Sequence, residues 1–261
     1  MGKGTLVGVI AGFAAIFGAM VMEGGNPASL IAPPALLLIV VGTFGAACAG
    51  TSLETALDAL RAIPLAFAAH EVDRPAIVER FMGYADQARR EGLLSLEETL
   101  DREAEPMVVA GVRMLIDGSD PSVVRSTVVA MTLARRRTWD RRADFWSKMG
   151  GYAPTLGIIG TVLGLIHTLE SLGGDPAELG HLIAAAFIAT FFGVMFANVL
   201  FLPFAAKFKL VGAELQALGE LVCVGVDLLG QGASQMIVRE RLVAHLTEDD
   251  AVTVSQLQRA A

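Results

Sequence analysis

The chain has 261 residues, of which 20 are Lys or Arg and 27 are Asp or Glu, so its formal net charge at pH 7 is −7. Hydrophobic residues make up 54% of it and charged residues only 18%, and the mean hydropathy is +0.57. Since soluble domains are about 45–50% apolar and about 25% charged, this composition excludes a disordered chain and favours a membrane protein over an ordinary soluble enzyme. The acidic balance argues against nucleic acid as a partner, and two cysteines cannot form a disulfide framework.

Four stretches of the chain are long and apolar enough to cross a bilayer, which takes about 20 residues of helix. Residues 4–22, 30–50, 149–169 and 182–202 contain no Asp, Glu, Lys or Arg. They predict four transmembrane helices, whose Gly and Ala content is typical of close packing in lipid. The alternative is four buried helices of a large soluble core. Lys3 precedes the first run as in a signal peptide, but the run is long and a second follows, so we expect a retained span.

The positions of the basic residues predict the orientation of these spans. All 20 Lys and Arg residues lie outside the two short connections 23–29 and 170–181. Because cytoplasmic loops carry the excess of basic residues, both termini and the long middle segment are expected in the cytoplasm. The predicted fold is an all-α membrane protein with four domains or segments: a transmembrane hairpin (1–50), a large cytoplasmic helical domain (51–148), a second hairpin (149–203) and cytoplasmic C-terminal helices (204–261).

Helix signals continue outside the predicted spans. Asp73 and Pro75 frame the start of a helix over 74–90, and Gly92 lies where a C-terminal cap is expected. Trp139 and Trp146 precede the third span and fit an interfacial aromatic belt. Residues 247–261 are expected to form a loose polar tail.

The predicted spans contain no carboxylate. His167 is the single histidine within them, and the other polar groups that we consider are hydroxyls and an amide. Proteins that pass protons or cations through hydrocarbon normally carry a functional ionisable group there, whereas a lone intramembrane Thr most simply helps helices to pack. If this chain lines an ion pathway, we therefore expect another polypeptide to supply the charged group.

Two prolines lie near the cytoplasmic ends of the last two spans, Pro154 and Pro203. Proline removes a backbone hydrogen bond and kinks or ends a helix. One interpretation is that each proline marks a helix boundary. The other is a hinge that couples events in the membrane to the cytoplasmic helices.

Several segments in chain order carry a resemblance to a known family. They are EGG (23–25), PPA (33–35), VGTFGA (41–46), ARREGLLSLE (88–97), YAPTLGIIGTVLGLI (152–166) and ATFFGVMFANVLFLPF (189–204). Together they resemble the flagellar motor stator subunit family (MotA/PomA) of the MotA/TolQ/ExbB proton channel superfamily. The resemblance covers nearly the whole chain.

The resemblance implies a multi-pass protein of the bacterial inner membrane that forms a ring, a pentamer, around a dimer of a single-span partner (MotB/PomB). That partner is anchored to peptidoglycan, and its membrane aspartate carries the ion. Inward flow of H⁺ or Na⁺ is then expected to turn the ring and drive the rotor through its switch protein (FliG). The implied function is a torque-generating ion channel with no cofactor, no metal site and no catalytic residue, in contact with membrane lipids.

The resemblance also implies roles for individual residues. Pro154 and Pro203 match the family's two functional prolines. Arg89, Arg90, Glu97 and Glu98 match the charged residues that meet the rotor. Complementary charges on an exposed element suit salt-sensitive docking, although position 100 is Leu where some relatives carry another acid.

Two threonines match positions along the ion path of the family. Thr190 matches a hydroxyl on the fourth span. Thr161 matches a position that is typically Thr in sodium-driven relatives and often a small apolar residue in proton-driven ones. Two hydroxyl groups could bind a dehydrated sodium ion as oxygen ligands, whereas a proton relay needs only a chain of water. The pair therefore favours Na⁺ weakly over H⁺.

Three other classes of protein compete with this interpretation. An ExbB/TolQ-like energy-transducing channel subunit would have three spans and a different loop order. A secondary transporter would show internal repeats and broken helices, which are not evident in the sequence. A membrane-bound enzyme would need a nucleophile and base, a metal motif or a phosphate-binding loop, and the four histidines lie scattered. The sequence favours the stator subunit.

Overall fold

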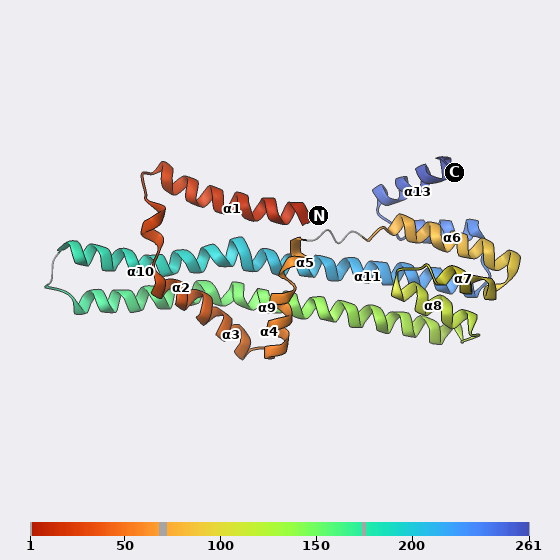
Figure 1. Cartoon of the computed structure of the whole chain (residues 1–261), viewed down its shortest axis with the longest axis horizontal. Coiled ribbons are helices and arrows are strands. Elements are labelled where there is room, and N and C mark those ends of the chain that lie inside the picture. The colour runs from red at the N-terminus through yellow and green to blue at the C-terminus, as the bar shows by residue number, and fades with distance from the viewer. Residues whose placement is uncertain (1, 68–71, 174–175, 261) are drawn as a thin grey trace. The chain divides into compact units, whose positions relative to one another are not determined.

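The computed structural model describes residues 2–67, 72–173 and 176–260, and all regular structure in these ranges is helical. The chain divides into two compact units (Figure 1). Unit 1 comprises residues 1–70 and 139–211, and unit 2 comprises residues 71–138 and 212–261. The two longest helices, α9 and α11, contribute residues to both units. The expected all-helical fold is confirmed.

Unit 1 begins with α1 (Gly2–Met22), in which no residue from 4 to 22 is fully buried within the single chain. Its remaining N-terminal elements follow in order: η1 (Pro27–Leu30), α2 (Pro33–Leu37), the π-helical turn η2 (Leu38–Gly42), α3 (Thr43–Ala49), α4 (Leu53–Arg61) and α5 (Ile63–Phe67). Ser52 caps α4, because its hydroxyl accepts a hydrogen bond from the Thr55 amide at 3.2 Å.

The other half of unit 1 comes from the second part of the chain. It contains the end of α9 (Pro121–Glu170), α10 (Pro176–Phe196), the π-helical turn η4 (Ala197–Phe201) and the start of α11 (Leu202–Gly230). In Figure 1, α9 and α10 run side by side in opposite directions. By length and hydropathy, three described helical stretches could cross a membrane: Gly4–Met22, Pro121–Glu170 and Glu178–Gly230. The apolar helical stretch Pro33–Ala49 is shorter.

Glycine allows α9 and α10 to approach closely. A Cβ atom on Gly160 would lie 2.5 Å from the Ala189 Cβ, and one on Gly164 would lie 2.6 Å from the Ala186 Cβ. A Cβ on Gly193 would lie 2.4 Å from the carbonyl oxygen of Ala153, which is a backbone atom and cannot move aside alone. Small residues at such an interface are what holds helices together in lipid.

The two tryptophans lie in the core of unit 1. Trp146 is 3% exposed, packs against Phe204 with ring centroids 5.2 Å apart, and donates from its indole nitrogen to the Ala59 carbonyl at 3.3 Å. Trp139 is 8% exposed and packs against Phe208. Both rings thus fill an aromatic cluster with phenylalanines of η4 and α11, whereas an interfacial belt would have them face outward.

Unit 2 is built around its own apolar core. Its elements are α6 (Arg74–Glu91), η3 (Leu93–Leu96), α7 (Glu97–Leu100), α8 (Pro106–Ile116), the start of α9, the end of α11, α12 (Gln235–Val243) and α13 (Glu248–Ala260). Phe81, Met107 and Leu218 are among its fully buried side chains. A Cβ on Gly219 would lie 2.1 Å from the Thr132 Oγ1, so this helix pair also depends on glycine.

The ends of α6 follow the sequence signals. Asp73 accepts a hydrogen bond from the Ala76 amide at 3.0 Å, and Gly92 ends the helix with φ +86° while its amide donates to the Ala88 carbonyl. The loose tail expected after residue 247 is not found up to Gln256: α13 begins at Glu248, and Val254 is fully buried in the core of unit 2. A single buried valine is too weak a pattern to distinguish a packed helix from a polar tail.

Candidate functional site: an oxygen-lined helix pair and a charged surface of unit 2

Thr161 on α9 and Thr190 on α10 bring four oxygen atoms together. Their hydroxyl oxygens lie 2.5 Å apart. Thr161 Oγ1 lies 3.0 Å from the Ala186 carbonyl oxygen on the opposite helix, and Thr190 Oγ1 lies 3.0 Å from the Gly157 carbonyl oxygen, also across the interface. The structure thus joins the two threonines that the sequence singled out. Side chains this short reach across only because glycine lets the helices approach.

The cluster contains more acceptors than protons. Two hydroxyl groups supply two protons, while the two hydroxyl oxygens and two carbonyl oxygens can all accept. At any moment some lone pairs therefore face one another without a proton between them. Hydroxyl and carbonyl oxygens are the kind of ligand that hard cations such as Na⁺ prefer.

An apolar cavity of about 350 Å³ adjoins this cluster between α2, α9 and α10. Gly160, Ala186 and Ala189 line it together with Leu38, and His167 lies at its edge. None of the residues that line it is Asp or Glu. The α9–α10 pair thus places two hydroxyl groups beside an apolar cavity and contributes no carboxylate to its lining.

The two prolines do not end helices. Pro154 lies inside α9, which continues to Glu170. Pro203 lies in the first turn of α11, directly after the π-helical turn η4, where the Leu202 amide donates to the carbonyl of Ala197 five residues back. Because proline clashes with the carbonyl four residues earlier, a wider turn before it relieves the strain. The boundary interpretation is therefore wrong for Pro154, whereas Pro203 does lie at the boundary between η4 and α11.

Unit 2 carries the four charged residues expected to face the rotor. Arg89 and Arg90 lie in the last turn of α6, and Glu97 and Glu98 lie in the first turn of α7, with Gly92 and η3 between them. Arg90 pairs with Asp86 at 3.0 Å. Among the described residues, Arg89, Glu97 and Glu98 form no ion pair, and all three are exposed. Arg89 is therefore freer than Arg90 to bind a partner.

The connection between α6 and α7 is held in place by side chains of α6. The Gln87 amide nitrogen donates to the Ser95 carbonyl at 2.8 Å, and the Thr99 hydroxyl donates to the Gln87 amide oxygen at 3.1 Å. The Ser95 hydroxyl donates to the Gly92 carbonyl at 2.7 Å. These bonds fix the spacing between the basic and acidic residues, which a flexible loop would not.

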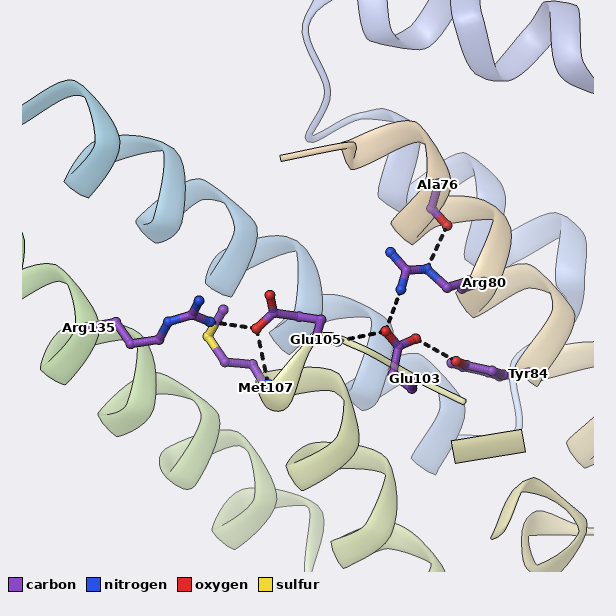
Figure 2. A network of polar contacts seen from close by, with 7 residues as sticks. All are labelled: Ala76, Arg80, Tyr84, Glu103, Glu105, Met107 and Arg135. Atoms are coloured by element: carbon purple, nitrogen blue, oxygen red, sulfur yellow. Dashed lines mark hydrogen bonds and ion pairs between the residues drawn. The ribbon is translucent and has the colours of Figure 1, made fainter. Parts of the chain in front are cut away.

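A buried carboxylate at Glu103 anchors the segment that follows (Figure 2). Its side chain is fully buried and accepts hydrogen bonds from Arg80, from the Tyr84 hydroxyl at 2.7 Å and from the Glu105 amide at 2.9 Å. Glu105 in turn caps α8 and pairs with Arg135 at 2.6 Å. Burial is the main cause that raises the pKa of the Tyr84 phenol above its ordinary value, and the nearby Glu103 carboxylate raises it further.

No local sequence signal marks Glu103 as an anchor, although Glu105 before Pro106 has the form of a helix N-cap. The pair formed by Asp58 on α4 and Arg142 on α9 was not predicted either. There two hydrogen bonds of 2.8 and 3.0 Å link the carboxylate to the guanidinium group. This bond to Arg142, opposed by burial, lowers the pKa of Asp58 below 3.8. Because Asp58 and Arg142 are 84 positions apart, no local sequence pattern predicts their contact.

These features define an all-helical protein with membrane-length helices, and comparisons with known proteins identify its family. Residues 99–218 match the MotA/TolQ/ExbB proton channel family, and residues 6–91 match the motility protein A N-terminal family. The chain is 30% identical to motility protein A of Bacillus subtilis (strain 168), over 98% of this chain and 95% of that one. It is 31% identical to motility protein A of Treponema pallidum, over 93% of each.

Two solved structures are similar over almost the full length. The C. jejuni MotAB structure matches with a TM-score of 0.90 and 26% identity, covering 95% of this chain and 97% of that one. The flagellar MotAB stator complex from Bacillus subtilis matches with a TM-score of 0.88 and 30% identity, covering 95% and 98%. The chain belongs to the MotA/TolQ/ExbB proton channel family, as a homologue of motility protein A.

Proposed function

We propose that this chain is the ion-channel-forming stator subunit of a bacterial flagellar motor, which couples inward ion flow to torque on the rotor. The observation that carries the proposal is the α9–α10 pair, where Thr161 and Thr190 line a close glycine-rich interface beside a cavity without a carboxylate. Similarity to motility protein A and to MotAB stator complexes over more than nine-tenths of the chain supports it.

The membrane arrangement we propose has four spans, at about 4–22, 30–50, 149–169 and 182–202. Both termini, the segment 51–148 and the segment 204–261 lie in the cytoplasm of a cell with this protein in its inner membrane. The distribution of basic residues supports this orientation, since all 20 lie outside the two short connections. The four charged rotor-facing residues then lie on the cytoplasmic side.

The partner we propose is a single-span, peptidoglycan-anchored protein of the MotB type that supplies an aspartate to the pathway. Copies of this chain form a ring around it, a pentamer around a partner dimer. The absence of Asp and Glu from the predicted spans supports the division of labour, because an ion path through hydrocarbon needs a group that can bind and release charge. Moving one charge through 100 mV supplies about 2.3 kcal/mol for rotation.

In the proposed pathway the ion passes the four-oxygen cluster of Thr161 and Thr190 on its way to the partner's aspartate. The excess of acceptors over protons in that cluster supports Na⁺ as the coupling ion over H⁺. Pro154 and Pro203 are proposed to transmit changes in the pathway to the cytoplasmic helices. The π-helical turn before Pro203 supports this role, because such turns frequently lie at functional sites.

Torque is proposed to pass through Arg89, Arg90, Glu97 and Glu98 to the rotor switch protein, FliG. An ExbB/TolQ-like subunit is less well supported, because residues 6–91 match the motility protein A N-terminal family. The proposal is tested by expressing the gene with its partner in a motile bacterium that lacks its own stator genes. Swimming should return, and its speed should follow external sodium at fixed pH. Expressed and membrane-inserted complexes that leave the cells paralysed would contradict it.

A further inference from the structure

A small cavity lies at the C-terminal end of α6, next to the charged residues proposed to face the rotor. Its volume is about 120 Å³. Its walls are mostly apolar, and Arg89 forms the charged part of the wall. The apolar lining includes Ala85, Ala88, Leu93, Leu229 and Ala233. All of these residues belong to unit 2.

The size and lining of the cavity suit one aliphatic side chain. Its volume is about that of four water molecules, each of which occupies about 30 Å³ in the liquid. Water molecules surrounded by alanine and leucine find few polar partners, so an apolar group gains by displacing them. The guanidinium group of Arg89 in the wall has no carboxylate partner among the described residues, so a carboxylate beside the incoming side chain would complete the site.

Leu94, which follows the cavity-lining Leu93 in the sequence, is an exposed apolar side chain. Its side chain is 72% exposed, whereas its neighbour Leu93 lines the cavity. The bonds of Gln87 and Ser95 described above hold this connection rigid. Single exposed leucines are common on protein surfaces. This one differs because it lies in a fixed connection between Arg89 and the acids Glu97 and Glu98, none of which forms an ion pair with a described residue.

We propose that the cavity and Leu94 form the apolar centre of the rotor-docking surface. The occupant is a surface of the rotor protein on which an aliphatic side chain lies next to a carboxylate. The aliphatic side chain enters the cavity, the carboxylate binds Arg89, and Leu94 packs against the apolar part of the rotor protein. This inference rests on the proposed function and adds an apolar anchor to its charge pairs. Binding energy concentrates where apolar contacts are ringed by polar groups that exclude water.

The test measures binding of a fluorescent rotor switch protein to the purified complex of this chain with its single-span partner. Ala88→Leu fills the cavity from the last turn of α6, and Leu94→Ser removes an exposed apolar side chain. Each should weaken binding about 30-fold, as at an interface hot spot. The matched controls are Ala130→Leu, the same change on an exposed face of α9, and Val252→Ser on α13, where the side chain is 53% exposed. Both controls should bind like the wild type.

A second measurement separates the two proposals. Ion flux through the same complexes in liposomes should be equal for the wild type, Ala88→Leu and Leu94→Ser, which also shows that the variants are folded. Wild-type binding by both variants, together with loss of binding in Arg89→Glu, would mean purely electrostatic docking and would overturn this inference alone. A wild-type complex that conducts ions yet binds no rotor protein would overturn it as well. A wild-type complex that neither conducts nor binds would overturn the proposed function.

Discussion

The hydroxyl groups of Thr161 and Thr190 lie 2.5 Å apart, and each also reaches a carbonyl oxygen of the other's helix. The two residues therefore form a reciprocal bridge between α9 and α10. An interhelical hydrogen bond in a membrane contributes only about 0.6 kcal/mol on average. The bridge thus contributes little to the stability of the helix pair, and its loss should affect ion passage more than folding.

Replacing Thr161 with Val tests this distinction, because Val keeps the branched shape and removes the hydroxyl. The complex should retain its melting temperature within the small cost of one hydrogen bond. The external sodium concentration that gives half-maximal swimming speed should rise severalfold. Thr161→Ser, which restores the hydroxyl, should swim nearly as the wild type does. Equal sodium dependence of the Val variant and the wild type would remove Thr161 from the pathway.

Close approach of α9 and α10 predicts that one added methyl group disrupts their packing. In Gly193→Ala the new Cβ would lie 2.4 Å from the Ala153 carbonyl oxygen, so the helices must separate, at a cost of about 1–3 kcal/mol. Gly151→Ala, on α9 with nothing within 4 Å of its Cβ, should be neutral or stabilise by up to about 1 kcal/mol. Thermal unfolding of the purified complexes compares the two. Similar melting temperatures would show that the interface is looser than described.

The basic pair at the end of α6 should not contribute equally. Arg90 is engaged by Asp86, an exposed pair of a kind worth about 0.2–1 kcal/mol, whereas Arg89 is unpaired among the described residues. Torque in tethered cells should therefore fall much further in Arg89→Ala than in Arg90→Ala. Immunoblots of membrane fractions control for expression. A larger loss in Arg90→Ala would reverse the assignment.

The buried carboxylate of Glu103 should control the stability of unit 2. Glu103→Gln removes the charge that faces Arg80 and should cost about 1.5–3 kcal/mol, and Tyr84→Phe removes one neutral donor and should cost about 1 kcal/mol. Hydrogen exchange in the segments of α6 and α8 measures both, because the two tryptophans lie in unit 1 and do not report on this unit. Unchanged exchange in Glu103→Gln would contradict the role of this carboxylate as an anchor.

The Asp58–Arg142 pair predicts a dependence of stability on pH. Because the pKa of Asp58 is lower in the folded protein than 3.8, the pair stabilises the fold above pH 3.8, and this contribution is lost as the pH falls through the lower, folded value. Asp58→Asn should therefore melt earlier than the wild type at pH 7, and the difference should shrink below pH 3.8. Trp146 fluorescence reports on α4, since its indole nitrogen donates to Ala59. A difference that stays constant down to low pH would contradict the pairing.

Features with a local or periodic basis could be predicted from the sequence. The cap at Asp73, the turn at Gly92 and the helical nature of the long apolar runs all follow from residue type and spacing. Family resemblance then singled out Thr161 and Thr190, whose contact no spacing rule gives, since 29 residues separate them.

Features that depend on tertiary packing could not be predicted. Trp139 and Trp146 have the residue type and position of an interfacial belt, yet an aromatic cluster buries them. Pro203 indicates an interrupted helix, but a π-helical turn absorbs the interruption and the chain stays helical. Glu103 resembles any surface glutamate until α6 supplies Arg80 and Tyr84 around it. In each case the outcome depends on residues far away in the sequence or on the local backbone geometry, neither of which a sequence pattern shows.

We propose that this chain forms the wall of an ion pathway whose titrating acid belongs to another protein. The most direct test is sodium and proton flux into liposomes under an imposed membrane potential, with the chain alone and together with its single-span partner. The chain alone should give no flux above that of empty liposomes. The complex should conduct, and its flux should be lost when the partner's membrane aspartate is replaced by asparagine. Flux through the chain alone that matches the complex would contradict the claim.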